Sequence, residues 1–190
     1  MTDDNLLPFS LPSVARKKVT ADFDGGRLTS DGGVMLLSMA ERRLGVAERL
    51  ARCFPDRRDP ARIVHTLADM IRARIFAISC GYEDADDLDF LRADPAFKLA
   101  CGRLPDTGRD LCSQPTLSRL ENAPSLKDAI RLSYALVDQW MDAYEREPAS
   151  VTLDIDDTCD VVHGHQQLSR IYPLPCHGAQ SLNPCAHGSD

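Results

Sequence analysis

Residues 59–81 read DPARIVHTLADMIRARIFAISCG, and this stretch indicates that the chain is mainly helical. Its apolar side chains recur at intervals of three and four residues, as they do on the buried face of an α-helix. These apolar positions are Ile63, Leu67, Met70, Ile71, Ile75 and Ile78. Asp59 and Pro60 supply an N-cap and a first-turn proline, and Gly81 ends the pattern. We therefore expect one continuous helix that begins at Pro60 and ends before Gly81.

Further helices are predicted on both sides of this stretch. Apolar spacing and a glycine stop predict helices over 34–44 and 46–53, and Asp94 with Pro95 opens another helix that Gly102 ends.

The last long helix is expected from Ser125 to about Glu145. One side of it is apolar, and we expect these side chains to pack in the core: Leu126, Ile130, Tyr134, Val137, Trp140, Met141 and Tyr144. The acidic stretch 83–89 lacks the spacing of a calcium-binding loop. We expect it to supply a helix start and surface charge.

Short strands are predicted at both ends of the helical region. Segments 19–23 and 27–29 are joined by a glycine-rich turn, which predicts a β-hairpin. Over 150–155 apolar and polar residues alternate, which predicts a β-strand.

Composition limits the class of protein. The 190 residues are 43% hydrophobic and 27% charged, which suits a globular chain of one domain, or one domain and part of another. No apolar stretch is long enough to cross a bilayer and the N-terminus lacks a secretory pattern, so we expect a cytoplasmic protein without a membrane partner. The seven cysteines show no paired spacing, and we expect free thiols.

Three carboxylates lie at the end of the predicted C-terminal strand, namely Asp154, Asp156 and Asp157. Strand geometry places Asp154 and Asp156 on one face about 7 Å apart, with Asp157 turned away. Two charges at that distance repel by about 2 kcal/mol at an effective dielectric constant of about 20, and a divalent cation would compensate for this repulsion. Mg²⁺ binds carboxylates together with phosphate oxygens. The alternative is an exposed, aspartate-rich turn whose charges are screened by water.

Two histidines lie shortly after these aspartates. His163, His165 and Gln166 could ligate a metal, donate hydrogen bonds to DNA phosphates, or form a polar turn, and their spacing does not decide among these.

Two segments are chemically suited to DNA. Ser113 is expected to cap a helix that exposes polar residues able to contact bases and phosphates, namely Gln114, Thr116, Ser118 and Arg119. Seven arginines lie between Glu41 and Arg62, and among them we select Arg57 and Arg58 as DNA contacts. The alternatives are an ordinary capped helix and a solvated helix face.

Taken together, a series of motifs resembles the insertion-sequence transposases of the 1380 family, DDE group. The motifs are Asp22 to Gly26, Leu28 to Gly33, Gly81 to Asp84, Leu91 to Pro95, Ser113 to Asn122, Leu153 to Thr158 and His163 to Ser169. They occur in order from about residue 19 to Ser169, so the resemblance covers the N-terminal portion of such an enzyme.

The resemblance implies a helical region for binding and assembly on transposon-end DNA, followed by a ribonuclease H-like domain with Mg²⁺. The fold expected is mainly α with a short N-terminal β-hairpin and a C-terminal stub of a ribonuclease H-like α/β domain. The expected divisions are a lead-in (1–18), a helical DNA-binding domain (19–147), the first strand of the truncated catalytic domain (148–169) and an irregular, out-of-frame tail (170–190).

In that family two aspartates and a glutamate hold the metal ions. The resemblance assigns the first of these aspartates to Asp156, with Asp154 as the second choice, and implies DNA transposition by cleavage and strand transfer in the complete enzyme. It predicts that this chain alone binds double-stranded DNA, in a form compatible with a homodimer, without cutting it.

Two alternatives remain from the residues. Asp154 to Thr158 also resembles the first motif of haloacid dehalogenase-type phosphatases, in which Asp154 would be the nucleophile. The third interpretation is a non-catalytic DNA-binding module.

Overall fold

The computed structural model describes residues 11–20 and 28–152. The described residues form the α-helices α1 (Val34–Leu44), α2 (Val46–Ala51), α3 (Leu67–Ser79), α4 (Leu88–Leu91), α5 (Pro95–Ala100), α6 (Gln114–Glu121) and α7 (Leu126–Met141), with the 3₁₀ turns η1 (Pro60–Arg62) and η2 (Ala85–Asp87). The mainly helical class expected from the sequence is confirmed. The chain divides into two compact units, Met1–Glu147 and Pro148–Asp190.

The corner between α1 and α2 forms because of one glycine and one glutamate. Gly45 has φ of +63°, a left-handed conformation that ends α1 and that glycine adopts without strain. The carboxylate of Glu41 accepts hydrogen bonds from the backbone N–H groups of Val46 (3.1 Å) and Ala47 (2.9 Å). Glu41 therefore caps the start of α2 from inside the preceding helix. Both predicted helices are confirmed here.

The helix expected from Pro60 to Gly81 is interrupted, and this prediction is wrong over residues 60–66, because the α-helix begins at Leu67. Asp59 caps only η1, and the chain is extended again at Ile63. A second signal then begins α3: the Thr66 hydroxyl accepts from the Asp69 N–H (3.1 Å), and the Asp69 carboxylate accepts from the Thr66 N–H (3.3 Å). This capping box is the stronger start because it satisfies two backbone donors at once.

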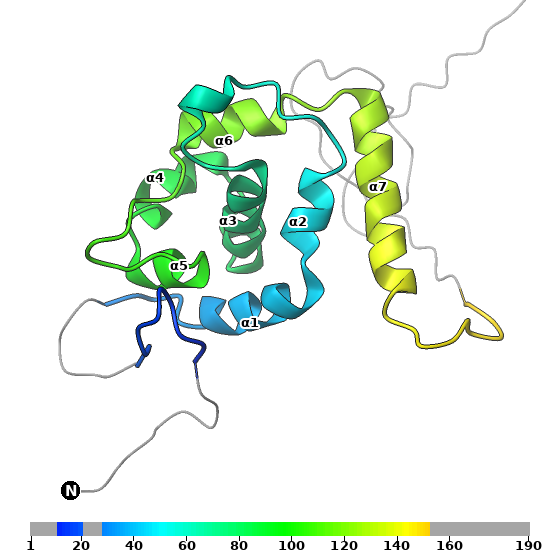
Figure 1. Cartoon of the computed structure of the whole chain (residues 1–190), viewed down its shortest axis with the longest axis horizontal. Coiled ribbons are helices and arrows are strands. Elements are labelled where there is room, and N and C mark those ends of the chain that lie inside the picture. The colour runs from blue at the N-terminus through cyan, green and yellow to red at the C-terminus, as the bar shows by residue number, and fades with distance from the viewer. Residues whose placement is uncertain (1–10, 21–27, 153–190) are drawn as a thin grey trace, which may run out of the picture. The chain divides into compact units, whose positions relative to one another are not determined.

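The buried core surrounds α3. In Figure 1, α3 lies among the other short helices, and it contacts α1, α2 and α6. The largest buried side chains in this cluster are Phe76, Phe97, Met70, Leu88 and Leu117, each no more than 2% exposed. They come from four different helices, α3, α4, α5 and α6, so burial of this shared cluster is what stabilises helices too short to be stable alone.

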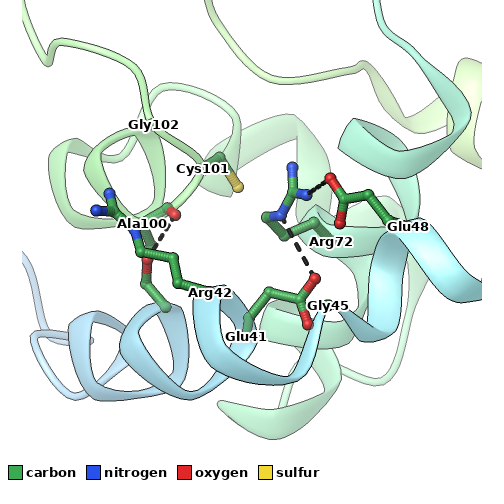
Figure 2. Close-up of a pocket in the computed structure, with 9 residues that line it drawn as sticks. Glu41, Arg42, Gly45, Glu48, Arg72, Ala100, Cys101 and Gly102 are labelled. Carbon is green, nitrogen blue, oxygen red and sulfur yellow. Dashed lines mark hydrogen bonds and ion pairs between the residues drawn. The ribbon is translucent and has the colours of Figure 1, made fainter. Parts of the chain in front are cut away.

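An ion-pair cluster at Arg72 ties three of these helices together. Arg72 of α3 lies 3.7 Å from Glu41 of α1 and forms a short ion pair with Glu48 of α2. These side chains line a hollow of about 380 Å³, in which the thiol of Cys101 also lies (Figure 2). Ser38 also lines this hollow, and its hydroxyl donates to the Ala100 carbonyl (2.8 Å), which joins α1 to α5.

The shorter helices begin where the sequence predicts. Asp94 accepts hydrogen bonds from the Ala96 and Phe97 N–H groups at the start of α5, and Pro95 occupies its first turn. The acidic stretch 83–89 forms η2 and the start of α4, with Asp84 as the cap of η2. Its expected role as a helix start is confirmed.

α7 forms where it was expected, but its apolar side does not pack in the core. Ser125 and Asp128 form a capping box at its start, as the predicted boundary requires. The apolar side expected in the core is instead exposed, from 45% at Trp140 to 80% at Leu126. α7 contacts α2 through its other side, where Ala135 is buried, so the prediction of core packing is wrong.

The predicted strands are not observed within the described residues. Residues 19–20 and 28–29 at the two ends of the expected hairpin form no strand, and its turn (21–27) lies outside the described residues. Residues 150–152 are also without a strand, and the remainder of that prediction lies beyond them. Apolar alternation alone cannot form a strand, because a strand requires a partner for its backbone hydrogen bonds.

Candidate nucleic-acid interface

A hollow of about 310 Å³ joins the two segments that the sequence singled out for DNA. One wall is the loop 54–58, and the other is α6 with the turn that leads into α7. Thr116 and Arg119 of α6 line it together with Arg57 and Arg58 of the loop. Residues about sixty positions apart in sequence therefore face one space.

The loop wall is organised around Asp56. Its carboxylate accepts from the Arg58 guanidinium through Nε (2.8 Å) and Nη2 (2.6 Å), and from the Arg58 backbone N–H (3.1 Å). These hydrogen bonds hold the pKa of Asp56 below its usual range, with the Arg58 side chain as the main cause. Arg58 is thus fixed and its charge is paired, whereas Arg57 is exposed and has no ion pair among the described residues.

The helical wall presents one face of α6. Thr116, Arg119 and Leu120 are spaced by three and four residues, so they lie on the same side of the helix. The Thr116 hydroxyl lies 3.1 Å from that of Ser113, the N-cap residue. Arg119 is exposed, and the described part of the chain holds no ion-pair partner for it.

The other predicted residues of α6 lie elsewhere. Gln114 and Ser118 line a separate hollow together with Glu83 and Asp84. The Gln114 backbone N–H also faces the Asp89 carboxylate (3.4 Å), so an acidic residue already occupies the start of α6. The structure therefore places Gln114 and Ser118 in a different hollow from Arg57, Arg58 and Arg119.

The same acidic hollow contains one arginine whose charge is paired. Arg74 Nε lies 2.6 Å from Glu121 Oε1, without the alignment of a hydrogen bond. Its terminal nitrogens donate to the backbone carbonyls of Tyr82 (3.3 Å) and Glu83 (2.7 Å). This side of α6 has no unpaired positive charge among its lining residues.

Asp128 at the start of α7 completes the arginine-lined hollow. Its pKa is lowered chiefly by the hydrogen bond from the Ser125 hydroxyl (2.7 Å), and Arg131 adds a charge pair (3.2 Å). Asp56 and Asp128 are therefore each compensated by another group. Arg57 and Arg119 are the arginines of the lining without an ion pair among the described residues, and the charge of Arg57 contributes weakly to the lowered pKa of Asp128.

Sequence reasoning missed two of these contributions. The neutralising role of Asp56 had a local signal in the sequence. An aspartate two residues before an arginine can accept hydrogen bonds from both the side chain and the backbone N–H of that arginine. The approach of α6 to the loop 54–58 had no local signal, because the packing of α3 and the chain reversal before α7 determine it.

The basic run 41–62 does not form one face. Arg49 pairs with Asp142, Arg58 with Asp56, and Arg62 lies 3.6 Å from Asp59. In the part of the chain that the structure describes, the arginines of this run without an ion pair are Arg42, Arg43, Arg52 and Arg57. Of these, Arg57 lines the hollow that α6 shares.

The expected metal and phosphate ligands cannot be placed. Asp154, Asp156, Asp157, His163, His165 and Gln166 lie outside the described residues. Over residues 11–20 and 28–152, no cluster of three His, Cys, Asp or Glu side chains is arranged to hold a metal ion. The same residues include no helix long and apolar enough to span a membrane.

Comparison with protein families provides the assignment. Residues 11–173 match the family described as Transposase DDE domain group 1. The chain belongs to the DDE transposases. No curated protein and no solved structure gave a match. The matched region of this DDE transposase includes α1 to α7 as well as Asp154, Asp156 and Asp157.

Proposed function

We propose that the helical unit of this DDE transposase binds double-stranded DNA during transposition. The observation that carries the proposal is the convergence of Arg57 and Arg119 on one hollow, both exposed and both without an ion pair among the described residues. Exposed arginines that no carboxylate neutralises are suited to contact phosphates.

The charges around this hollow support a phosphate-binding role. Arg58 and Asp56 neutralise one another, and Asp128 is held by Ser125 and Arg131. Arg119, and Arg57 with only a weak interaction with Asp128, are then available to attract an anion, despite the overall charge of −7. Thr116 adds a hydroxyl at the same wall.

The DNA contact is proposed for one face of α6. Gln114 and Ser118 share their hollow with Glu83 and Asp84, whose charges repel phosphate. The arginine-lined face therefore approaches the DNA backbone, and the acidic face is turned away from it.

Fluorescence anisotropy with a labelled duplex tests this proposal. We expect Arg57→Gln and Arg119→Gln each to weaken binding about eightfold at about 0.1 M salt, since each removes one phosphate contact and its counterion release. Arg43→Gln is the matched control, because Arg43 is equally exposed and unpaired but lies on α1, away from the hollow. Equal losses of affinity in all three variants would show nonspecific electrostatic attraction and would contradict the proposed DNA-binding face.

For the catalytic function, we propose that the chain supplies the first metal-ligating aspartate of a DDE centre of the 1380 insertion-sequence type. Asp156 is the first choice and Asp154 the second, on the basis of the motif Leu153 to Thr158. Bound Mg²⁺ would activate the attacking oxygen and stabilise phosphate charge. The family match favours this interpretation of the motif over the phosphatase alternative.

Calorimetric titration of Mg²⁺ into the chain with bound duplex distinguishes the two aspartates. Loss of the binding heat in Asp156→Asn but not in Asp154→Asn supports Asp156, and the reverse pattern moves the role to Asp154. Unchanged heat in both variants would contradict a metal-ligating role for this motif.

A further inference from the structure

α7 presents its apolar side away from the domain to which it belongs. In Figure 1 α7 lies next to α2, which it contacts. Arg49 of α2 forms an ion pair with Asp142, the residue that follows α7. The side chains buried on this helix are those of Asp128 and Ala135. The residues two positions after these, Ile130 and Val137, lie about 200° around the helix, on its opposite side, and both are large and apolar.

Five of the exposed apolar residues form a regular seam, and Leu126, Leu136 and Trp140 are exposed beside it. The seam residues are Ile130 (50% exposed), Tyr134 (67%), Val137 (50%) and Met141 (56%), followed by Tyr144 (46%). The intervals are four, three, four and three residues, which is the heptad spacing of helices that pair side by side. The pattern spans two heptads, and α7 itself ends at Met141 within it.

Two opposite charges flank this seam on the same edge. Arg131 directly follows Ile130, and Asp138 directly follows Val137. The two charged residues are seven positions apart, so they occupy the same position in consecutive heptads. Arg131 is half-exposed and lies 3.2 Å from Asp128 through one nitrogen, which leaves other donors of its guanidinium available. Asp138 is exposed and has no ion pair among the described residues.

These charges make the surface complementary to itself in one orientation. When two copies of the seam lie antiparallel, Arg131 of each faces Asp138 of the other, and Tyr134 packs against Val137. When two copies lie parallel, Arg131 faces Leu126 and Asp138 faces Ser133, so no charge is matched. Burial of the seam would also remove a large exposed apolar patch from water.

We propose that α7 is a homodimerisation surface, which pairs antiparallel with α7 of a second copy of this chain. The interface is centred between Tyr134 and Val137 and bounded by two Arg131–Asp138 pairs. Because it is two heptads long it is small, and the dimer is in concentration-dependent exchange with the monomer.

Sedimentation velocity of the full chain over a range of micromolar concentrations tests this assignment. The wild-type chain should shift from monomer to dimer as concentration rises, and Val137→Glu should remain monomeric. Leu136→Glu is the matched control, since Leu136 is similarly exposed (53%) on the next position but lies outside the seam. A wild-type chain that is monomeric throughout, or a dimer equally sensitive to both variants, would overturn the proposal.

A charge exchange tests the orientation. Arg131→Glu and Asp138→Arg should each weaken self-association about tenfold, because two attractive pairs become repulsive. A mixture of these two variants should recover the wild-type affinity, since each repulsive contact becomes attractive in the mixed dimer. Circular dichroism verifies that both variants fold, and failure of the mixture to recover contradicts antiparallel pairing.

Discussion

Replacement of Arg72 by methionine is expected to destabilise the helical unit more than any surface charge removal. Arg72 has a side chain only 17% exposed and faces Glu41, whose side chain is 7% exposed. Arg72→Met retains most of the volume and removes the charge. The Glu41 carboxylate then keeps its two N–H donors at the start of α2 but loses its positive partner.

The magnitude follows from this burial. Removal of one partner of a buried ion pair costs about 3 to 5 kcal/mol, because the remaining charge is uncompensated in a medium of low polarity. The two N–H donors of α2 stabilise the Glu41 carboxylate, so we expect the lower end, about 3 kcal/mol. Against a total stability of about 5 to 15 kcal/mol, this loss is large.

Urea unfolding followed by circular dichroism at helical wavelengths measures the change. Glu48→Gln is the control, since it removes an Arg72 partner whose side chain is 50% exposed, and it should cost less than about 1 kcal/mol. The double variant Arg72→Met with Glu41→Gln should be more stable than Arg72→Met alone. A cost below about 1 kcal/mol for Arg72→Met, or an equal cost for Glu48→Gln, would refute the reasoning.

Three further outcomes are expected. Thr66→Ala should cost about 1 kcal/mol in the same urea assay because the α3 capping box is lost, and an unchanged midpoint would contradict that role. Burial raises the pKa of the Cys101 thiol to about 12. Iodoacetamide at pH 8 should therefore alkylate this thiol about a thousandfold more slowly in the folded chain than in urea, measured by peptide mass spectrometry. Similar rates in both conditions would argue against burial of the thiol. Burial, and then the Arg103 charge, lower the pKa of His65, so the unfolded chain takes up this proton first as the pH falls below about 6.5. The free energy of unfolding should therefore decrease from pH 7 to pH 5, and His65→Gln should remove part of that decrease.

Local signals in the sequence predict most of the helix boundaries. Gly45 and Gly102 end helices because a left-handed residue is needed there, and Asp94 with Pro95 begins one because its side chain satisfies the first N–H groups. The start of α3 was misplaced since Asp59 and Thr66 both offer caps. The choice between these two caps depends on the Asp69 carboxylate, which accepts a hydrogen bond from the Thr66 N–H.

Tertiary placement is what the sequence could not provide. The apolar spacing of α7 correctly predicts a helix, but spacing does not state whether the apolar side faces a core or solvent. The convergence of Arg57 with Arg119 likewise depends on how α6 packs, which no local pattern encodes. The family assignment could be reached earlier, because it depends on ordered motifs rather than on contacts.

The salt dependence of duplex binding tests the central claim, that the Arg57 and Arg119 face holds DNA, most directly. Affinity is measured by anisotropy between about 50 and 200 mM salt for the wild-type chain and for the double variant Arg57→Gln with Arg119→Gln. The slope of log K for duplex binding against log salt concentration should be smaller in magnitude by about 1.8 in the double variant, because two phosphate contacts are lost. An unchanged slope, or no wild-type binding at the lowest salt, would contradict this claim.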